Sequence, residues 1–230
     1  MGALAQALAT VRRPVRGFRE LADGNPPLGR STGRMLAWWL PVAYAHGALT
    51  AWSFLGTYQA LRAGHLPWWT GLLPPGSLDP EVLRDLLRGL PAPPSGSVLA
   101  GWVMVLVPLG VLGAWLHHAV WDHTCLWLLG GLGERRGFRT SLLAEAQALR
   151  ISALGSVLAL LGFLPKTGWL LALPLAGVEA FFWIFRGFSL AAFHRCPTWK
   201  GVAATVLHLA LVGCLAGGLL GLVLLLSLRA

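Results

Sequence analysis

Five long apolar runs constrain this chain more than any other feature of its sequence. Each run is close to the about 20 residues that a helix needs to cross a bilayer, and none alternates polar with apolar residues as barrel strands do. Lipid offers no hydrogen-bond partner to the backbone, so such runs must be helical. We therefore predict an all-α, polytopic transmembrane helical bundle of about five spans. The expected spans are 36–60, 98–121, 143–164, 169–192 and 202–227.

The composition agrees with lipid as the main solvent. Hydrophobic residues make up 56% and charged residues 12% of the 230 residues, whereas soluble domains carry about 25% charged residues. The net charge of +9 does not predict a nucleic-acid partner, because the bases lie between the apolar runs rather than on one continuous face. Membrane lipids are the partner that this charge predicts. No nucleophile elbow, phosphate-binding glycine loop or HExxH motif is present, and we expect no cofactor.

The distribution of arginine and lysine predicts an orientation, because cytoplasmic loops retain these residues. A cytoplasmic N-terminus places most bases on that side and the C-terminus on the opposite side. The one sizeable outer loop is then 62–97. Within it, Asp79 and Pro80 have the pattern of a helix N-cap and a first-turn proline, and leucines follow at helical spacing. The pattern predicts a short helix on the outer surface.

The segment 1–34 differs from the spans and predicts a basic, amphipathic cytoplasmic arm. Leu4, Leu8 and Val11 share one helical face, and four arginines lie between positions 12 and 19. A basic amphipathic helix beside a first span is typical of a segment that lies on the cytoplasmic leaflet. An arm that binds a protein partner is the alternative. The five-helix transmembrane domain then occupies 35–230.

A cluster of polar residues ends the second span and raises the question of a metal site. His118 and Asp122 share a helical face at four-residue spacing, and His123 follows directly. Such spacing is able to hold a divalent metal when further ligands join, and Glu145 and His194 are the nearest candidates. The interpretation that we favour is a set of interfacial groups bonded to water, headgroups or helix ends.

Glu179 lies about ten residues inside the fourth expected span. A carboxylate in hydrocarbon costs several kcal/mol unless it is paired, so we expect it to face the bundle interior. Arg186, His208 and His46 are its candidate partners. This group predicts either proton or substrate handling or a structural bond between helices.

Small residues form a stripe in the fifth expected span, where Gly213, Gly217 and Gly221 recur every four residues. Such a stripe lets two helices approach closely. We favour packing inside the bundle over the formation of a homo-oligomer.

Several short motifs resemble the Yip family, the Ypt/Rab-interacting membrane proteins and their prokaryotic relatives. The segment from His123 to Thr140 has the family's histidine at the end of the second span, its glycine pair and its Gly-Phe step into the third. Three other stretches agree in order along the chain. The residues that carry the resemblance are Pro14, Phe18, His123, Gly130, Gly131, Pro174, Gly177 and His194. Independently of it, Gly130 and Gly131 predict a helix that ends in a left-handed turn.

The resemblance implies a five-span, non-enzymatic membrane protein. The family's Tyr-Ala pair and proline early in the third span are missing, and the loop 62–97 is longer than in the family. Eukaryotic relatives act in vesicle transport and contact Rab-type GTPases. Our leading hypothesis is a non-enzymatic adaptor, membrane-organising or lipid-interacting factor. The alternatives are a small transporter or lipid-moving protein that uses Glu179 and the histidines, and a membrane metalloenzyme that uses His118, Asp122 and His123.

Overall fold

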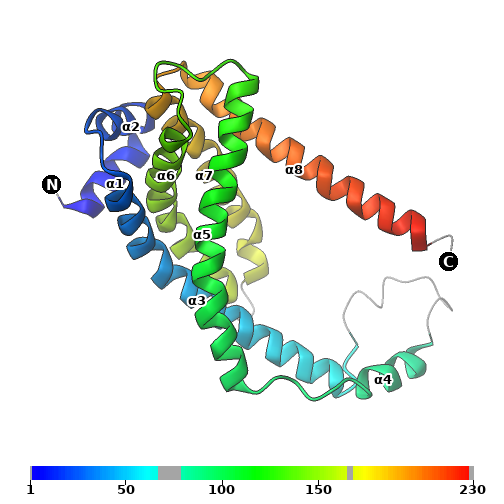
Figure 1. Ribbon diagram of the computed structural model, residues 1–230. Coiled ribbons are helices and arrows are strands. Elements are labelled where there is room, and N and C mark those ends of the chain that lie inside the picture. The colour runs from blue at the N-terminus through cyan, green and yellow to red at the C-terminus, as the bar shows by residue number, and fades with distance from the viewer. Residues whose placement is uncertain (1, 67–78, 165–167, 228–230) are drawn as a thin grey trace. The chain divides into compact units, whose positions relative to one another are not determined.

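The computed structural model describes residues 2–66, 79–164 and 168–227, all helical or in turns and connections (Figure 1). Part of the predicted outer loop, 67–78, lies outside the described residues. The elements are α1 (Ala3–Arg12), α2 (Pro14–Asp23), α3 (Leu28–Arg62), α4 (Pro80–Arg88), α5 (Gly96–Leu128), α6 (Phe138–Ala159), the 3₁₀ turn η2 (Leu160–Phe163), α7 (Gly168–His194) and α8 (Thr198–Ser227). The described chain contains no strand, which confirms the predicted all-α class.

Four helices are long and apolar enough to cross a membrane, and the chain is a multi-pass membrane protein. These segments are Gly96–Leu128, Phe138–Phe163, Leu170–His194 and Thr198–Leu222. They correspond to the last four predicted spans. The first predicted span, 36–60, lies inside α3, which has 35 residues but is not among the four. Tryptophan, tyrosine, histidine and proline within it lower its mean hydropathy. Tryptophan and tyrosine favour the membrane interface.

The chain forms two compact units, which are described separately. The bundle unit comprises Met1–Val42 and Gly110–Ala230, and the hairpin unit comprises Ala43–Leu109. In the hairpin unit, Tyr58 donates to the Pro91 carbonyl at 2.9 Å. Asp79 accepts from the Glu81 N–H at 2.8 Å and caps α4. The predicted short helix at Asp79–Pro80 is therefore confirmed.

In the bundle unit, α6 is the central helix. Its side chains from position 141 to 155 are nearly all buried. Leu126 of α5, Leu190 of α7 and Ala204 of α8 pack with Leu143 of α6 in one apolar cluster. Among the side chains of α7 and α8 that the structure describes, the buried ones lie only in the half of each helix next to the α7–α8 turn. The core therefore fills one half of these spans, and the other half carries exposed apolar side chains.

The N-terminal arm packs against this core with a face that includes Val11 of the predicted apolar face. Ala7 and Phe18 are fully buried with Ile151 and Phe185, and the Phe18 and Phe185 ring centroids lie 4.8 Å apart. Leu4 and Leu8 of the predicted apolar face are exposed instead. The predicted boundary between positions 34 and 35 falls inside α3, so arm and bundle belong to one unit.

The predicted left-handed turn after α5 is present. Gly130 has φ +59°, which glycine adopts without the steric cost of a Cβ. The Gly131 N–H bonds to the Leu126 carbonyl at 2.8 Å and the Gly130 N–H to the Trp127 carbonyl at 2.9 Å. This is the Schellman pattern of helix ends, and it turns the chain from α5 toward α6.

Candidate functional site

A buried ion-pair network lies at the centre of the bundle unit. Arg186 of α7 donates from Nη2 to Asp122 Oδ2 of α5 at 2.5 Å and from Nε to Glu145 Oε2 of α6 at 2.9 Å. The Arg186 side chain is 4% exposed and both carboxylates are 0% exposed. Its guanidinium also lies over the Trp183 ring, 4.6 Å from the centroid. Each buried ionic side chain thus lies next to one of opposite charge, as burial inside a membrane bundle requires.

His208 of α8 extends the network to a fourth helix. Its Nδ1 lies 2.6 Å from Asp122 Oδ1, and because a carboxylate only accepts, Nδ1 carries the proton. Asp122 thus joins Arg186 on one oxygen and His208 on the other. One carboxylate therefore links α5 to both α7 and α8.

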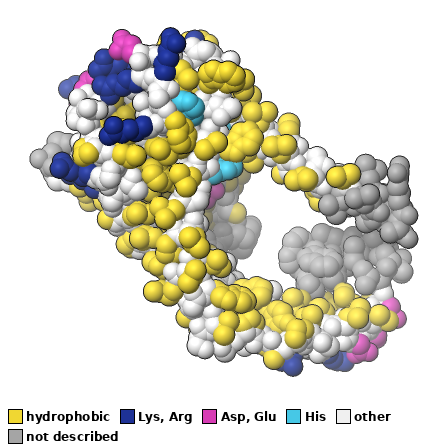
Figure 2. All heavy atoms as spheres, viewed as in Figure 1, with side chains coloured by type: hydrophobic (Ala, Val, Ile, Leu, Met, Phe, Trp, Pro, Cys, Tyr) yellow, Lys and Arg dark blue, Asp and Glu magenta, His cyan; other side chains and the backbone are white. Residues whose placement is uncertain are grey.

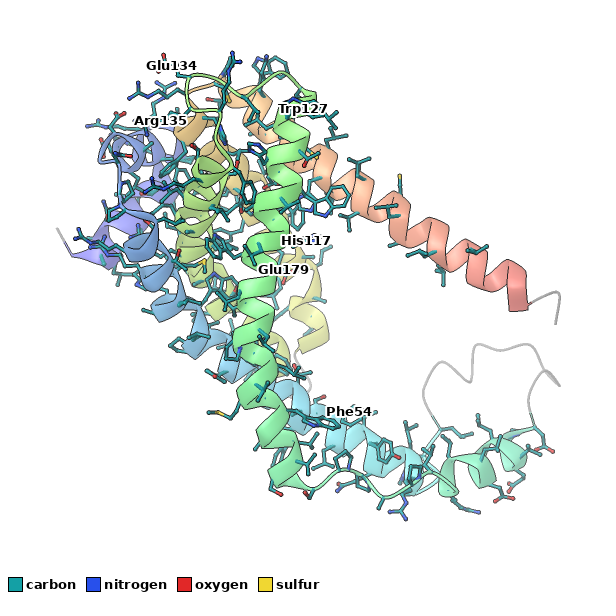
Figure 3. The ribbon with its side chains drawn as sticks, in the orientation of Figure 1. Phe54, His117, Trp127, Glu134, Arg135 and Glu179 are labelled. Carbon is teal, nitrogen blue, oxygen red and sulfur yellow. The ribbon has the colours of Figure 1, made fainter. Side chains whose placement is uncertain are left out.

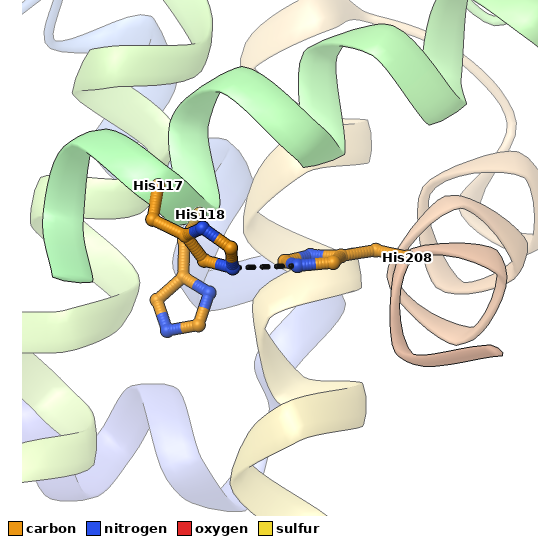
Figure 4. A group of neighbouring side chains, drawn as sticks. All are labelled: His117, His118 and His208. Carbon is orange, nitrogen blue, oxygen red and sulfur yellow. Dashed lines mark hydrogen bonds between the residues drawn. The ribbon is translucent and has the colours of Figure 1, made fainter. Parts of the chain in front are cut away.

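Three imidazoles come together beside this network (Figure 4). His117 and His118 of α5 and His208 of α8 offer ligand nitrogens that all lie within 4.8 Å of one another. His117 Nε2 is 3.3 Å from His208 Nε2. The ring of His118 stands edge-on to Trp183 at 5.3 Å, and its buried Nδ1 has no hydrogen-bond partner in the described part of the chain.

A chain of hydrogen bonds between side chains connects the helix ends beside the glycine turn. His194 Nδ1 donates to the Arg135 carbonyl at 2.7 Å, which leaves its Nε2 to accept from Ser141 Oγ at 2.8 Å. Ser141 Oγ in turn accepts from His123 Nδ1 at 2.9 Å. His123 and His194, which both carry the family resemblance, thus meet through one buried serine. This chain fixes α5, α6 and α7 to one another.

Bases, most of them exposed, gather where the arm and two turns of the bundle unit meet (Figure 2). Arg135 and Glu134 stand on the turn between α5 and α6 there (Figure 3). Arg135 donates to the Ala22 carbonyl of the arm at 3.3 Å, and Lys200 donates to the Gly130 carbonyl at 2.8 Å. The set, named the basic end, consists of Arg12, Arg13, Arg16, Arg19, Arg135, Arg136, Arg139, Arg195 and Lys200.

The expectation that Glu179 faces the bundle interior is wrong. Its side chain is exposed on α7 (Figure 3), and it makes no ion pair with another described residue. Arg186, its predicted partner, pairs with Asp122 and Glu145 instead. The reason is that the core covers only the half of α7 that contains Arg186. His46, another predicted partner, belongs to the hairpin unit.

The predicted metal set of His118, Asp122 and His123 is not assembled. Asp122 is occupied by Arg186 and His208, while His123 belongs to the chain through Ser141. His208 was expected to be a polar group inside the bundle, and it is fully buried. Pro174 and Gly177 lie within α7, where nothing stands within 4 Å of the space a Gly177 Cβ would fill.

Sequence reasoning missed the role of α6 in this site. Glu145, Gln147 and Arg150 lie close together in the third expected span, and all three are buried. Gln147 donates to Ser31 Oγ of α3 at 3.0 Å. Three polar residues within six positions of one span were the signal that this helix lies inside the bundle.

No protein-family model, curated protein or solved structure matches the chain.

Proposed function

We propose that the chain is a Yip-type, non-enzymatic membrane protein that interacts with lipids and organises the membrane through its basic end. The observation that carries the proposal is the excess of exposed bases there. Among the described residues, ion pairs join Arg16 to Glu20 at 2.8 Å and Arg195 to Glu134 at 3.0 Å. Most other bases of the set pair with no described acid. Anionic headgroups supply the missing negative charge, at about 1 kcal/mol for each base near the surface.

The basic end behaves as one surface because its segments are bonded together. The arm, the α5–α6 turn and the α7–α8 turn are linked by the bonds of Arg135 and Lys200 and by Arg195, which lies 3.7 Å from Asp23 of the arm. On the arm, exposed Leu4 and Leu8 stand close in sequence to these bases. Apolar side chains beside arginines suit insertion at the boundary between headgroups and acyl chains.

The same contacts support five crossings with a cytoplasmic N-terminus. Asp23 of the arm and Arg135 of the α5–α6 turn lie at one end of the bundle unit. The chain between them contains α3, the nine-residue α4 and α5. Because α5 crosses the membrane once, α3 must supply the return crossing. The positive-inside rule then places the basic end in the cytoplasm and the C-terminus on the opposite side.

The resemblance to the Yip family also gains a physical rationale. His123 and His194 meet at Ser141, and Gly130 makes the turn above them. Phe18 holds the arm against Phe185. Most of the residues quoted for the resemblance thus lie at the basic end, which is the part proposed to act, while Pro174 and Gly177 lie in the other half of α7. An adaptor role toward a protein partner would use the same surface.

Lipid selection in nanodiscs tests this function. Protein reconstituted in mixed phosphatidylcholine and phosphatidylglycerol is expected to retain phosphatidylglycerol above its input fraction, as measured by mass spectrometry of the lipids. A variant with Arg12, Arg13 and Arg19 changed to Gln loses this enrichment. The matched control changes Arg62, Arg84 and Arg88 of the hairpin unit to Gln and keeps it. Equal enrichment in the arm variant and the wild type would exclude the proposal.

Added salt sharpens the same experiment. Exposed charges are screened beyond about 8 Å at physiological ionic strength, so the enrichment is expected to fall steeply as salt rises. Enrichment that does not respond to salt would mean that apolar contacts, rather than the arginines, select the lipid.

A further inference from the structure

We propose that His117, His118 and His208 form a binding site for one divalent transition-metal ion of the zinc type. Imidazole nitrogens suit Zn²⁺ and its neighbours among the first-row metals. The site uses neither Asp122 nor His123 as a ligand, and it differs from the set that sequence spacing suggested. The site is also separate from the basic end, so the metal proposal can be tested independently of lipid binding.

The spacing of the three rings fits a single ion. Their centroids are 5.5, 5.2 and 5.6 Å apart. With zinc–nitrogen bonds of about 2.0–2.1 Å and tetrahedral angles, three imidazole rings around one ion have centroids separated by about 5 Å. The same geometry places two ligand nitrogens about 3.4 Å apart, and His117 Nε2 lies 3.3 Å from His208 Nε2. The ligand nitrogen of His118 lies within 4.8 Å of the other two.

The tautomer of His208 leaves its Nε2 unprotonated and facing the other two imidazoles. Its Nδ1 donates to Asp122 Oδ1 at 2.6 Å, so Nε2 presents a lone pair toward His117. A carboxylate that holds the far nitrogen of a ligating histidine is the usual outer partner in zinc sites, where it fixes the tautomer and raises the basicity of the ligand. Arg186 and Glu145 hold this carboxylate in place from α7 and α6.

His118 supplies an independent sign that a ligand belongs here. Its Nδ1 is buried and has no hydrogen-bond partner among the described residues. A buried nitrogen that makes no hydrogen bond destabilises the fold, and a metal bond removes that penalty. The packing of the ring against Trp183 at 5.3 Å limits its other freedom.

A carboxylate stands directly behind the site. Asp122 lies 2.6 Å from His208 Nδ1 and places an acid next to one of the three ligands. The site has three protein ligands, and one of them, His117, is exposed. A fourth coordination position is therefore open to a small ligand, as in catalytic zinc sites. Structural zinc sites have four protein ligands instead. The ion also bridges α5 and α8, which adds a link between these two helices.

Metal binding by the purified full-length chain tests the site. After removal of metal with a chelator, the protein in detergent is expected to take up one Zn²⁺ per chain, as measured by elemental analysis. Co²⁺ in its place is expected to give the visible absorption bands of a tetrahedral nitrogen-ligated ion. His117→Ala weakens binding by at least about 10–100-fold, the range seen when even outer partners of metal sites are lost.

Two further variants make the result decisive. His65→Ala, an exposed histidine of the hairpin unit, is the matched control and keeps wild-type affinity. His118→Gln preserves side-chain bulk and lowers affinity as His117→Ala does. The proposal is overturned if the wild type binds no stoichiometric Zn²⁺, or if His117→Ala and His118→Gln both bind it as tightly as His65→Ala.

Discussion

The two halves of α7 carry similar apolar residues but lie in different surroundings. From Phe185 to His194 most side chains are buried against α2, α6 and α8, whereas Leu170, Leu173 and Phe181 in the first half are exposed. Arg186 and Glu179 are seven residues apart and share a helical face. One is buried between two carboxylates and the other has no partner among the described residues. A face of a membrane helix is therefore interior only where another helix covers it.

The same division runs through α8. Gly201 meets α7 so closely that an added Cβ would lie 2.7 Å from Ala191 Cβ, while Gly213, Gly217 and Gly221 have open space around them. The expectation that this glycine stripe packs inside the bundle is therefore wrong for the described chain. Both helices pack in the half next to the basic end, which is also where the polar residues of α6 are buried.

The largest effect is expected from removing Arg186, the central charge in the buried halves of α7 and α8. Arg186→Leu leaves Asp122 and Glu145 buried without their cation, and we expect it to lower the free energy of unfolding by about 3–5 kcal/mol. The lost stability is measured by heating the protein in detergent and determining, by size-exclusion chromatography, how much folded protein remains at each temperature. Arg62→Leu, at an exposed arginine, is the control and changes little. An unaffected Arg186→Leu variant would mean that the ion pairs do not hold these helices together.

The contact between the arm and α7 is the next largest effect. Phe18 is fully buried against Phe185, and truncation of such a side chain costs about 3 kcal/mol. Phe18→Ala is therefore expected to release α1 and α2, which limited trypsin digestion detects as faster cleavage at Arg12 and Arg16. Leu8→Ala, at a residue 47% exposed, leaves the digestion rate unchanged. Equal rates in both variants would place the arm away from α7.

The glycines of α8 give a smaller but well-matched comparison. Gly201→Ala forces the backbones of α7 and α8 apart and is expected to cost about 1–3 kcal/mol. Gly217→Ala meets nothing within 4 Å and gains up to about 1 kcal/mol from higher helix propensity. Thermal unfolding of the two variants side by side measures the difference. Similar losses in both would show that a surface of α8 beyond the packed half is also covered.

Much of the fold follows from local patterns in the sequence. Apolar runs of sufficient length gave α5 to α8, since lipid leaves the backbone no other way to satisfy its hydrogen bonds. Gly130 predicted the turn after α5, and Asp79 with Pro80 predicted the start of α4, because capping and left-handed turns depend on single residue types. These features need no knowledge of what packs against them.

The residues of the candidate site are brought together by packing between helices, so local sequence patterns did not predict them. Asp122 and His208 are 86 positions apart, and no periodicity links them. His118 and Asp122 share a face, but Asp122 is claimed by Arg186 from another helix. The rule that an ionic group inside a span turns inward identified Arg186 and His208 correctly. It failed at Glu179 because it says nothing about where along a helix the bundle ends.

The smallest predicted effect contrasts two identical substitutions of buried and exposed glutamates. Glu145→Gln removes one of the two counter-charges of Arg186 in the packed half and is expected to destabilise the protein by more than 1 kcal/mol. Glu179→Gln removes a charge that has no described partner and is expected to stay within about 0.5 kcal/mol of the wild type. Because the two variants lose the same charge and volume, their difference in unfolding temperature isolates the effect of position. If Glu179→Gln were as costly as Glu145→Gln, the exposed half of α7 would have to be covered by a polar partner, and the division between the two halves would not hold.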